Sequence, residues 1–577
     1  SWRAAAPEER LAHALVKGIE EHIADDVREI RARYPSALAV IEGPLMAGMS
    51  KVGELFAAGR MFLPQVIKSA RAMKRAVAYL EPWLIEERAA AAGGSSSAAP
   101  RERGAGKILM ATVKGDVHDI GKSIVGVVLA CNGFEIVDLG VMVARDAILD
   151  AAEKESADLV AISGLIAPSL EEMRDIARGM QARKMTVPLM IGGATTSAAH
   201  TAVRIAPEYG GLVVHARDAS AAAGIARSLL SPEKKTPFIA ETKREQERLR
   251  VAWERGEGKA RPLPLAEARS RRIAIDWKGA RISEPRHAGL HVFGDYPIEE
   301  LEPYIDWSFL LLAWDVPGRY PDVLGDPVRG PEARRLVDDG RALLAELVAG
   351  KRLRASGAFG LWPANSRGDD IVLWTGADRK AELARFPFLR SQTPEEGGSC
   401  PCLSDFVAPE GSGMLDYIGA FAVTAGLGSE EVARSYRRSG DDYKAIMSGT
   451  LADRLAEAFA ERLHEEVRRR FWGYEPVGAA TRGIRPSPGF PACPIHSDKT
   501  TILDLLDAER MIGIGLTESW MMTPAASVCG FYFAAEAARY FDVGPIAADQ
   551  RQDWANRAGL APAEAEKALR AVAGSRL

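Results

Sequence analysis

Apolar residues recur at helical spacing through the first ninety positions of the chain. The first run contains Leu11, Leu15, Ile19 and Ile23, and two more extend over residues 37–56 and 63–80. Residues three or four positions apart share one face of a helix, so each run predicts one or more amphipathic helices with a buried face. Together they predict a four-helix bundle over residues 1–92.

The pattern changes at Lys107, where short apolar runs begin to alternate with helical ones. The expected strands are 107–113, 134–139, 158–163, 187–191 and 212–215, and the expected helices are 121–131, 145–154, 169–183, 197–205 and 220–229. Such alternation predicts an α/β domain over residues 107–232, with a five-stranded parallel sheet of flavodoxin-like (Rossmann-type) order and helices on both faces.

Two segments flank this domain, and a larger region follows it. Residues 93–106 are rich in alanine, glycine and serine, which predicts a flexible linker. Residues 233–265 are rich in charge and predict a solvated, partly helical linker. Helical runs at 331–349, 451–470 and 562–573, with a strand at 371–374, predict an α+β domain over 266–577. The expected fold class is therefore multidomain.

Composition excludes several classes of protein. The 577 residues carry a net charge of -4, whereas a nucleic-acid-binding protein usually shows a basic surface. No apolar run is long enough to span a bilayer, and no signal peptide opens the chain. The five cysteines are scattered, and Cys400 and Cys402 lack the CxxC spacing of common zinc and redox sites. We therefore expect a cytoplasmic protein without a disulfide framework.

Six residues after the first predicted strand, 116–121, read Asp-Val-His-Asp-Ile-Gly. They place His118 between two carboxylates at the entrance of a helix. An imidazole in this setting can give one nitrogen to a metal while a carboxylate fixes its other N–H. The alternative is that Asp119 caps the helix and His118 is a surface loop residue. The local pattern leaves both interpretations open.

Other small and polar residues lie where later strands end. Ser163 and Leu165 follow the third strand, Ser169 opens the next helix, and Gly192 and Gly193 close the fourth strand. The carboxyl ends of parallel strands meet at one edge of the sheet, which is where such folds bind ligands. We therefore expect these residues to lie close to His118.

The combination of 116–121, Ser163, Leu165 and the paired glycines resembles the signature of cobalamin-binding domains that hold their cofactor base-off, with a histidine on cobalt. The preceding bundle resembles the cap over the corrin, and the last region resembles an S-adenosylmethionine-binding reactivation domain. The whole chain thus resembles the C-terminal part of the cobalamin-dependent methionine synthase family. Alternatives are a corrinoid methyl-carrier protein, a cobalamin-sensing binding module and an ordinary flavodoxin-like protein without cobalt.

The resemblance implies a role for each matching residue. His118 would be the lower axial ligand of cobalt, Asp116 would bond its other nitrogen, and Ser169 would support Asp116. The implied cobalamin contacts are Glu42, Phe56, Phe62, Leu63, Val66, Gly115, Asp116, Val117, His118, Asp119, Gly121, Ser163, Leu165, Ala167, Gly192, Gly193 and Ala219. From spacing alone, the apolar members of the cap set are ordinary core residues, and Glu42 is a solvated one.

The proline-rich segment from Arg485 to Pro494 is an extended loop, because it contains four prolines in ten residues. It resembles the S-adenosylmethionine-binding loop of the family. The implied contacts to that ligand are Asp306, Glu457, Arg485, Ser487, Gly489, Tyr540 and Phe541. Three positions depart from the family pattern: Ala167 replaces a threonine, Ser487 an alanine and Phe490 a tyrosine.

The resemblance also implies an activity and partners. The complete enzyme would carry a methyl group on cobalamin, as methylcobalamin, from methyltetrahydrofolate to homocysteine. S-adenosylmethionine and one electron would rescue oxidised cobalt. This chain would lack the N-terminal homocysteine and folate modules, including their zinc site. A flavodoxin-type protein would donate the electron, and the chain would be a monomer with no nucleic-acid or membrane partner.

Overall fold

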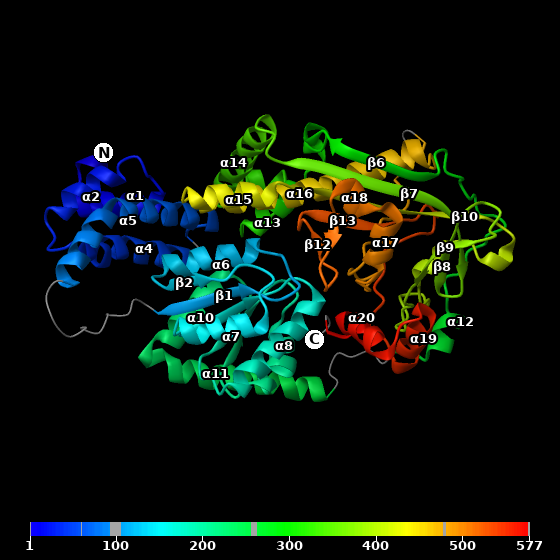
Figure 1. Ribbon diagram of the computed structural model, residues 1–577, viewed down its shortest axis with the longest axis horizontal. Coiled ribbons are helices and arrows are strands. Elements are labelled where there is room, and N and C mark those ends of the chain that lie inside the picture. Colours follow the sequence, from blue (N-terminus) through cyan, green and yellow to red (C-terminus); the bar gives the residue numbers. More distant parts are fainter. Residues whose placement is uncertain (1, 59, 93–105, 256–261, 477–480, 575–577) are drawn as a thin grey trace.

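The computed structural model describes residues 2–58, 60–92, 106–255, 262–476 and 481–574. A helical cap lies at one end of an elongated molecule, a parallel-sheet domain lies beside it, and a C-terminal domain extends to the other end (Figure 1). The predicted flexible linker, apart from Gly106, falls outside the described residues. Within the described parts, no helix is both long and apolar enough to cross a membrane.

The helical cap forms as its apolar periodicity predicts. Its helices are α1 (Pro7–Lys17), α2 (Ile23–Arg31), α3 (Ala37–Val40), α4 (Met46–Ala57) and α5 (Leu63–Ala92). The turn Ile41–Leu45 joins α3 to α4 and contains Pro44. Leu11, Leu15 and Ile23 have no exposed surface, so the predicted helix faces do form the core.

The parallel-sheet domain has the strand order β2-β1-β3-β4-β5, and helices cover both faces. Its strands are β1 (Lys107–Thr112), β2 (Glu135–Asp138), β3 (Leu159–Ser163), β4 (Leu189–Gly192) and β5 (Val213–His215). Its helices are α6 (Ile120–Cys131), α7 (Arg145–Lys154), α8 (Ala167–Ala182), α9 (Ala198–His200) and α10 (Ala219–Leu230). The predicted fold class is confirmed. The expected helix 197–205 is a short α9 continued by a wider turn over Thr201–Ile205.

Most of the segment predicted as a solvated linker is one regular helix, α11 (Pro232–Glu254). None of its residues is fully buried, but Phe238 and Ile239 are partly buried and pack against the neighbouring apolar core. Ion pairs three residues apart, Arg248–Glu245 and Arg250–Glu247, stabilise the exposed helix surface. Gln246 donates to the carbonyl oxygen of Val213 at 2.7 Å, which ties the helix to β5.

The C-terminal domain is built on a mostly antiparallel sheet with the strand order β13-β10-β7-β8-β9, and β6 pairs with β7. Its main strands are β6 (Gly289–Tyr296), β7 (Arg354–Arg367), β8 (Asp370–Trp374), β9 (Glu382–Pro387), β10 (Asp416–Leu427) and β13 (Ser527–Tyr532), with a small pair β11 (Gly515–Leu516) and β12 (Met522–Thr523). Its helices are α12 (Leu265–Ser270), α13 (Trp307–Ala313), α14 (Gly330–Ala349), α15 (Ser429–Arg438), α16 (Asp442–Glu466), α17 (Asp498–Leu506), α18 (Ala508–Ile512), α19 (Ala548–Ala558) and α20 (Pro562–Gly574).

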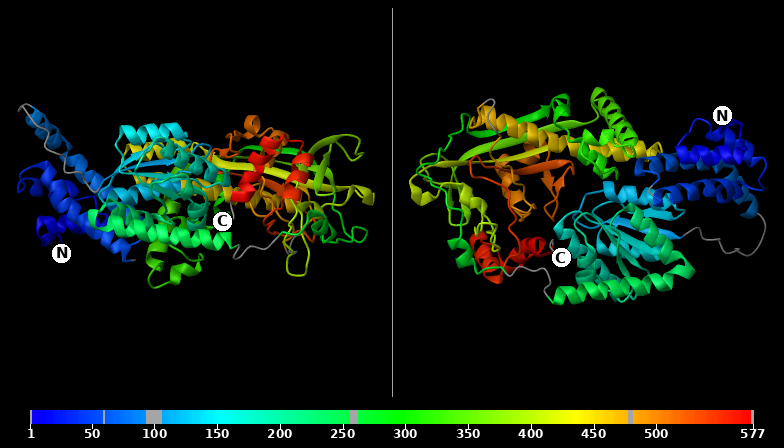
Figure 2. Two further views of the ribbon diagram at one scale, coloured as in Figure 1. Left: turned by 90° about the horizontal axis from the view of Figure 1, so that it is seen from below. Right: turned by 180° about the vertical axis from the view of Figure 1, so that it is seen from behind.

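Helix α16 of the C-terminal domain contacts both other domains. It starts nine residues before the predicted helix 451–470, because Asp441 caps it by accepting the backbone N–H of Lys444 at 3.0 Å. Along its length it packs on the C-terminal sheet, on α6 and on α5. Figures 1 and 2 show the C-terminal domain above the carboxyl edge of the parallel sheet, with the cap displaced to the far side of α6.

Helix α17 begins with a buried carboxyl group, that of Asp498, which is 6% exposed. The thiol of Cys493 donates to it, with 3.8 Å between Sγ and Oδ2. Burial raises the pKa of Asp498 to about 8. The folded protein therefore keeps this carboxyl protonated at neutral pH, whereas the unfolded chain ionises it near pH 4.

This burial predicts a stability that falls as pH rises between about 4 and 8, because the unfolded chain then binds fewer protons. Asp498→Asn should abolish this loss of stability. The difference in free energy of unfolding between the variant and wild type should therefore grow in favour of the variant, by up to about 1.4 kcal/mol per pH unit. Urea unfolding at several pH values measures it. Asp504→Asn, on the exposed side of the same helix, should keep the wild-type slope. Parallel slopes for wild type and Asp498→Asn would contradict the prediction.

Candidate functional site

The segment 116–121 brings a histidine and a buried carboxylate together. The Asp116 side chain has no exposed surface. Its Oδ1 lies 2.9 Å from Nδ1 of His118 and accepts the backbone N–H of His118 at 3.0 Å. Its Oδ2 accepts the hydroxyl of Ser169 at 2.7 Å and the backbone N–H of Leu165 at 2.6 Å. The loop after β1 is thereby joined to the start of α8.

The electrostatics of this pair decide which nitrogen of His118 carries the proton. Burial would raise the pKa of Asp116, but the His118 ring, the Leu165 N–H and the Ser169 hydroxyl together lower it to about 2. A carboxylate that stays ionised accepts a hydrogen bond from Nδ1–H, which keeps the proton on Nδ1 and leaves the lone pair of Nε2 available. The arrangement therefore suits a metal ligand better than an unconstrained loop histidine.

The paired glycines lie at the same edge of the sheet. Ser163 and Gly192 face each other in the register of β3 and β4. Gly193 has a φ of +118°, and a Cβ there would lie 1.9 Å from the carbonyl oxygen of Gly164. Glycine is therefore required for this close approach of two loops. Ala219 begins α10 one strand further along.

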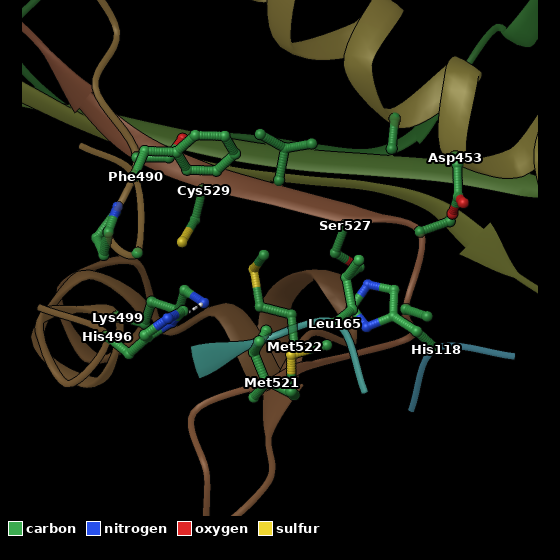
Figure 3. A pocket seen from close by; sticks show the side chains of 18 of the residues that line it. His118, Leu165, Asp453, Phe490, His496, Lys499, Met521, Met522, Ser527 and Cys529 are labelled. Carbon is green, nitrogen blue, oxygen red and sulfur yellow. Dashed lines mark hydrogen bonds between the residues drawn. The ribbon is translucent and has the colours of Figure 1, made fainter. Parts of the chain in front are cut away.

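His118 opens into a cavity of about 480 Å³ between the parallel-sheet and C-terminal domains (Figure 3). Leu165, Ala167 and Thr195 line it from the first domain, and the hydroxyl of Thr195 is buried without a partner among the described residues. An unpaired buried hydroxyl beside a histidine with a free nitrogen fits a ligand that offers both a metal centre and polar groups. Among the described residues, no cluster of three His, Cys, Asp or Glu side chains could hold a metal ion by itself.

Asp453 faces His118 from the opposite wall of the cavity (Figure 3). Burial raises its pKa to about 6, partly offset by His118 and Arg454. Glu457 follows one turn later on α16 and lines the same cavity. Our sequence prediction included Glu457 but missed Asp453, although two carboxylates four residues apart on one helix were a usable signal.

Two further residues that the sequence prediction missed, His496 and Lys499, lie at the far end of the cavity (Figure 3). Lys499 Nζ donates to Nδ1 of His496 at 3.1 Å and to the carbonyl oxygen of Trp520 at 3.1 Å. Burial, with the nearby Lys499 charge, lowers the pKa of His496 to about 3. His496 is therefore neutral and carries its proton on Nε2, which is then a hydrogen-bond donor for a ligand.

The residues predicted to bind S-adenosylmethionine divide into two groups. Ser487, Gly489 and Glu457 line the cavity. The other four, Asp306, Arg485, Tyr540 and Phe541, do not. Arg485 is paired with Glu461, and its backbone N–H donates to Tyr540 Oη at 3.0 Å.

Asp306 caps α13, with 2.9 Å from its Oδ1 to the Ser308 nitrogen. Phe541 is buried, with its ring centroid 6.3 Å from that of Phe406. In this structure Asp306 thus caps a helix and Phe541 packs against another aromatic ring.

Two of the remaining loop positions, Gly115 and Asp119, contact the C-terminal domain. Gly115 accepts the Thr517 hydroxyl at 3.1 Å, and a Cβ on Gly115 would lie 2.0 Å from Ser519 Oγ. Asp119 is paired with Lys122 at 3.0 Å and with Arg437. Val117 is partly buried and Gly121 lies in the first turn of α6. The loop that carries His118 is thus held by both domains.

None of the predicted cap residues lines this cavity: Glu42, Phe56, Phe62, Leu63 and Val66. Leu63 and Val66 are 2% exposed, and the Val66 carbonyl oxygen lies 3.8 Å from the thiol of Cys131 at the end of α6. Glu42 is exposed. In this arrangement the C-terminal domain, and not the cap, faces His118.

Three stretches of the chain match protein-family models. Residues 7–81 and 106–223 each match a B12 binding domain, and residues 297–559 match the activation domain of vitamin B12 dependent methionine synthase. Among solved structures, the chain is similar to the MetH reactivation domain bound to AdoHcy, with 43% identity over 54% of this chain and 98% of that chain and a TM-score of 0.53.

Two other solved structures match the chain over a smaller part. The methanol:cobalamin methyltransferase complex MtaBC from Methanosarcina barkeri has 25% identity over 41% of this chain and 84% of that chain, with a TM-score of 0.35. A cobalamin-binding protein from Desulfitobacterium hafniense DCB-2 has 26% identity over 38% of this chain and 95% of that chain, with a TM-score of 0.28.

The family resemblance inferred from the motifs is confirmed by the three family-model matches and by the related reactivation domain. The matched models cover the cap, the parallel-sheet domain and most of the C-terminal domain. The identity of 43% extends over nearly the whole of the related reactivation domain. The chain therefore belongs to the cobalamin-dependent methionine synthase family and contains its B12-binding and reactivation domains.

Proposed function

We propose that this chain is the cobalamin-binding and reactivating part of a cobalamin-dependent methionine synthase. It binds cobalamin base-off, with His118 on cobalt, and uses S-adenosylmethionine to restore the methylated cofactor. The observation that carries the proposal is the His118–Asp116–Ser169 chain of hydrogen bonds, which opens into a cavity walled by the C-terminal domain.

The residues of the parallel-sheet domain hold and orient the ligand nitrogen. Asp116 keeps the proton on Nδ1 of His118, so the lone pair of Nε2 is available to a metal. Ser169 and the Leu165 N–H keep Asp116 ionised although it is buried. Gly192 and Gly193 leave room for the nucleotide tail beside Ser163. Cobalamin, when bound, supplies a cobalt centre that accepts and donates a methyl group.

The C-terminal wall supplies complementary charge. S-adenosylmethionine carries a positive sulfonium, and Asp453 and Glu457 place two carboxyl groups on the same wall. Ser487 and Gly489 offer backbone groups from the proline-rich loop. Glycine is required at 489, because its φ is +100° and a Cβ there would lie 2.4 Å from the His496 ring. The AdoHcy in the related reactivation domain supports this assignment.

The proposal extends to partners that complete the reaction. Homocysteine and folate modules, the first with a zinc site, would supply the acceptor and donor of methyl transfer. A flavodoxin-type protein would deliver the electron for reactivation. We propose that the chain acts as a monomer in the cytoplasm and contacts neither nucleic acid nor membrane.

His118→Ala should remove the protein ligand to cobalt. The wild-type chain should shift the absorbance of added methylcobalamin away from that of the free base-on cofactor, because a protein imidazole replaces the cofactor's own base. The variant should lose the part of this shift that reports the imidazole on cobalt. His13→Ala, in the cap, is the control and should match wild type. The same spectrum in wild type, His118→Ala and free cofactor would exclude the ligand role.

Ser169→Ala should weaken cobalamin binding by about tenfold, because removing a group that supports a metal ligand typically has that effect. The loss should appear in an equilibrium titration followed by absorbance. Ser228→Ala removes a hydroxyl that donates to the Gly224 carbonyl oxygen, away from the site. It should bind as wild type does. Equal affinity in all three proteins would argue that Ser169 only packs.

Arg485→Ala should weaken S-adenosylmethionine binding by at least about fivefold, the effect of losing one charged hydrogen bond. Arg485 must give up its ion pair with Glu461 to bind the ligand, so the affinity that calorimetry measures is the net effect of the two interactions. Arg470→Ala, whose side chain is 72% exposed, is the matched control. If both variants bind as wild type does, Arg485 has no part in recognition of the ligand.

A further inference from the structure

Four polar side chains on α5 of the cap recur at every third position and contact the C-terminal domain. Gln65 donates to Glu332 at 3.2 Å, Lys68 to Asp339 at 2.7 Å and Arg71 to Asp441 at 2.9 Å, and Lys74 pairs with Asp442. We call Lys68, Arg71 and Lys74 the basic stripe, and Glu332, Asp339, Asp441 and Asp442 the acidic surface. Opposite charges thus face each other along three turns of one helix.

The centre of this interface is buried. Lys68 is 9% exposed, and its Nζ lies 4.5 Å from the ring centroid of Tyr443. The Tyr443 hydroxyl donates to the same carboxylate, Asp339, at 2.7 Å. Charges held in a buried network of this kind are screened less by salt than exposed pairs. This interface is more than a set of surface ion pairs.

The acidic surface is connected to the cavity by one rigid element. Asp441 caps α16 and also pairs with Arg71 of the cap. Twelve residues later on the same helix, Asp453 faces His118, a distance of about 18 Å at the α-helical rise. The position of the cap and the position of the cavity wall are therefore set by the same helix.

The interface uses a part of the cap that the proposed function requires elsewhere. Leu63 and Val66, which the family resemblance assigns to the upper face of the corrin, lie in the first turn of α5 beside Gln65 and Lys68. They are buried here against the end of α6. One surface of the cap cannot cover His118 and contact the acidic surface at the same time.

We propose that the acidic surface is a binding site for the basic stripe, and that it retains the cap away from the His118 cavity while the C-terminal domain faces it. The proposal rests on the proposed function, because binding of cobalamin at His118 gives the cap the alternative position over the corrin that the family resemblance implies. It makes the choice between the two positions electrostatic. Salt weakens the displaced position through the more exposed pairs, those of Arg71 and Lys74, whose side chains are 29% and 54% exposed. Specificity comes from matched charges along α5.

The test follows the cap in the full cobalamin-loaded chain. All five native cysteines are buried, so dyes can be attached selectively to two introduced cysteines. Glu21→Cys in the cap and Glu430→Cys on α15 are exposed positions outside the interface. Energy transfer between the dyes reports the cap position, and cobalamin absorbance in the same sample reports cofactor binding.

The triple variant Lys68→Gln, Arg71→Gln, Lys74→Gln should reduce the population of the displaced cap by roughly tenfold relative to wild type. Its matched control is Arg28→Gln, Arg33→Gln, Lys51→Gln, which removes the same charge from cap residues that contact no C-terminal residue in the described structure. The control should keep the wild-type position. Raising salt from about 0.05 to 0.5 M should shift wild type and control, and affect the triple variant much less.

A charge exchange tests the same interface with a double variant in which the ion pair is kept but reversed. Lys74→Asp and Asp442→Lys should each release the cap, and the double variant should restore it. Restoration supports the proposal, and single and double variants that all behave as wild type overturn it. If cobalamin absorbance shows no binding in wild type, the proposed function fails instead. A cap insensitive to salt and to every substitution, with cobalamin bound, overturns this inference alone.

Discussion

The arrangement of the site depends on one buried carboxylate. Asp116 is inaccessible to solvent, yet hydrogen bonds from His118, Leu165 and Ser169 keep it ionised. Without these bonds, burial would favour the protonated form and the proton on His118 Nδ1 would no longer be held. Because its partners come from the loops after β1 and β3, the same carboxylate also fixes how those loops approach each other. The same hydrogen bonds therefore set both the orientation of His118 and the fold of the sheet edge.

The cavity itself exists only where two domains meet. The parallel-sheet domain provides His118 and the C-terminal domain provides Asp453, and neither wall is complete alone. Contacts from Arg437 to Asp119 and from Thr517 to Gly115 hold the histidine loop against the second domain. The position of the histidine loop therefore depends on contacts with both domains.

Much of the fold could be predicted from the sequence because its signals are local. Strand and helix periodicity located the five parallel strands, and the rule that ligands bind at carboxyl ends placed Ser163, Ser169 and Gly192 near His118. The boundaries of α16 were less accurate, because its first turns depend on the cap formed by Asp441. The full length of helix α11 was not predicted, because its mostly charged sequence shows no regular apolar period.

The amino-acid sequence by itself determined the three-part architecture, the family and the histidine with its carboxylate, because each is encoded by residues close together in the chain or by a regular period. Tertiary structure alone decided which domain faces His118. Asp453, His496 and Lys499 lie more than three hundred residues from the histidine they share a cavity with, and no local pattern joins them. The same holds for the basic stripe on α5. Its charges look like an ordinary solvated helix face until the acidic surface is brought against them, because the energy of a charge pair depends on a distance that only the packed domains set.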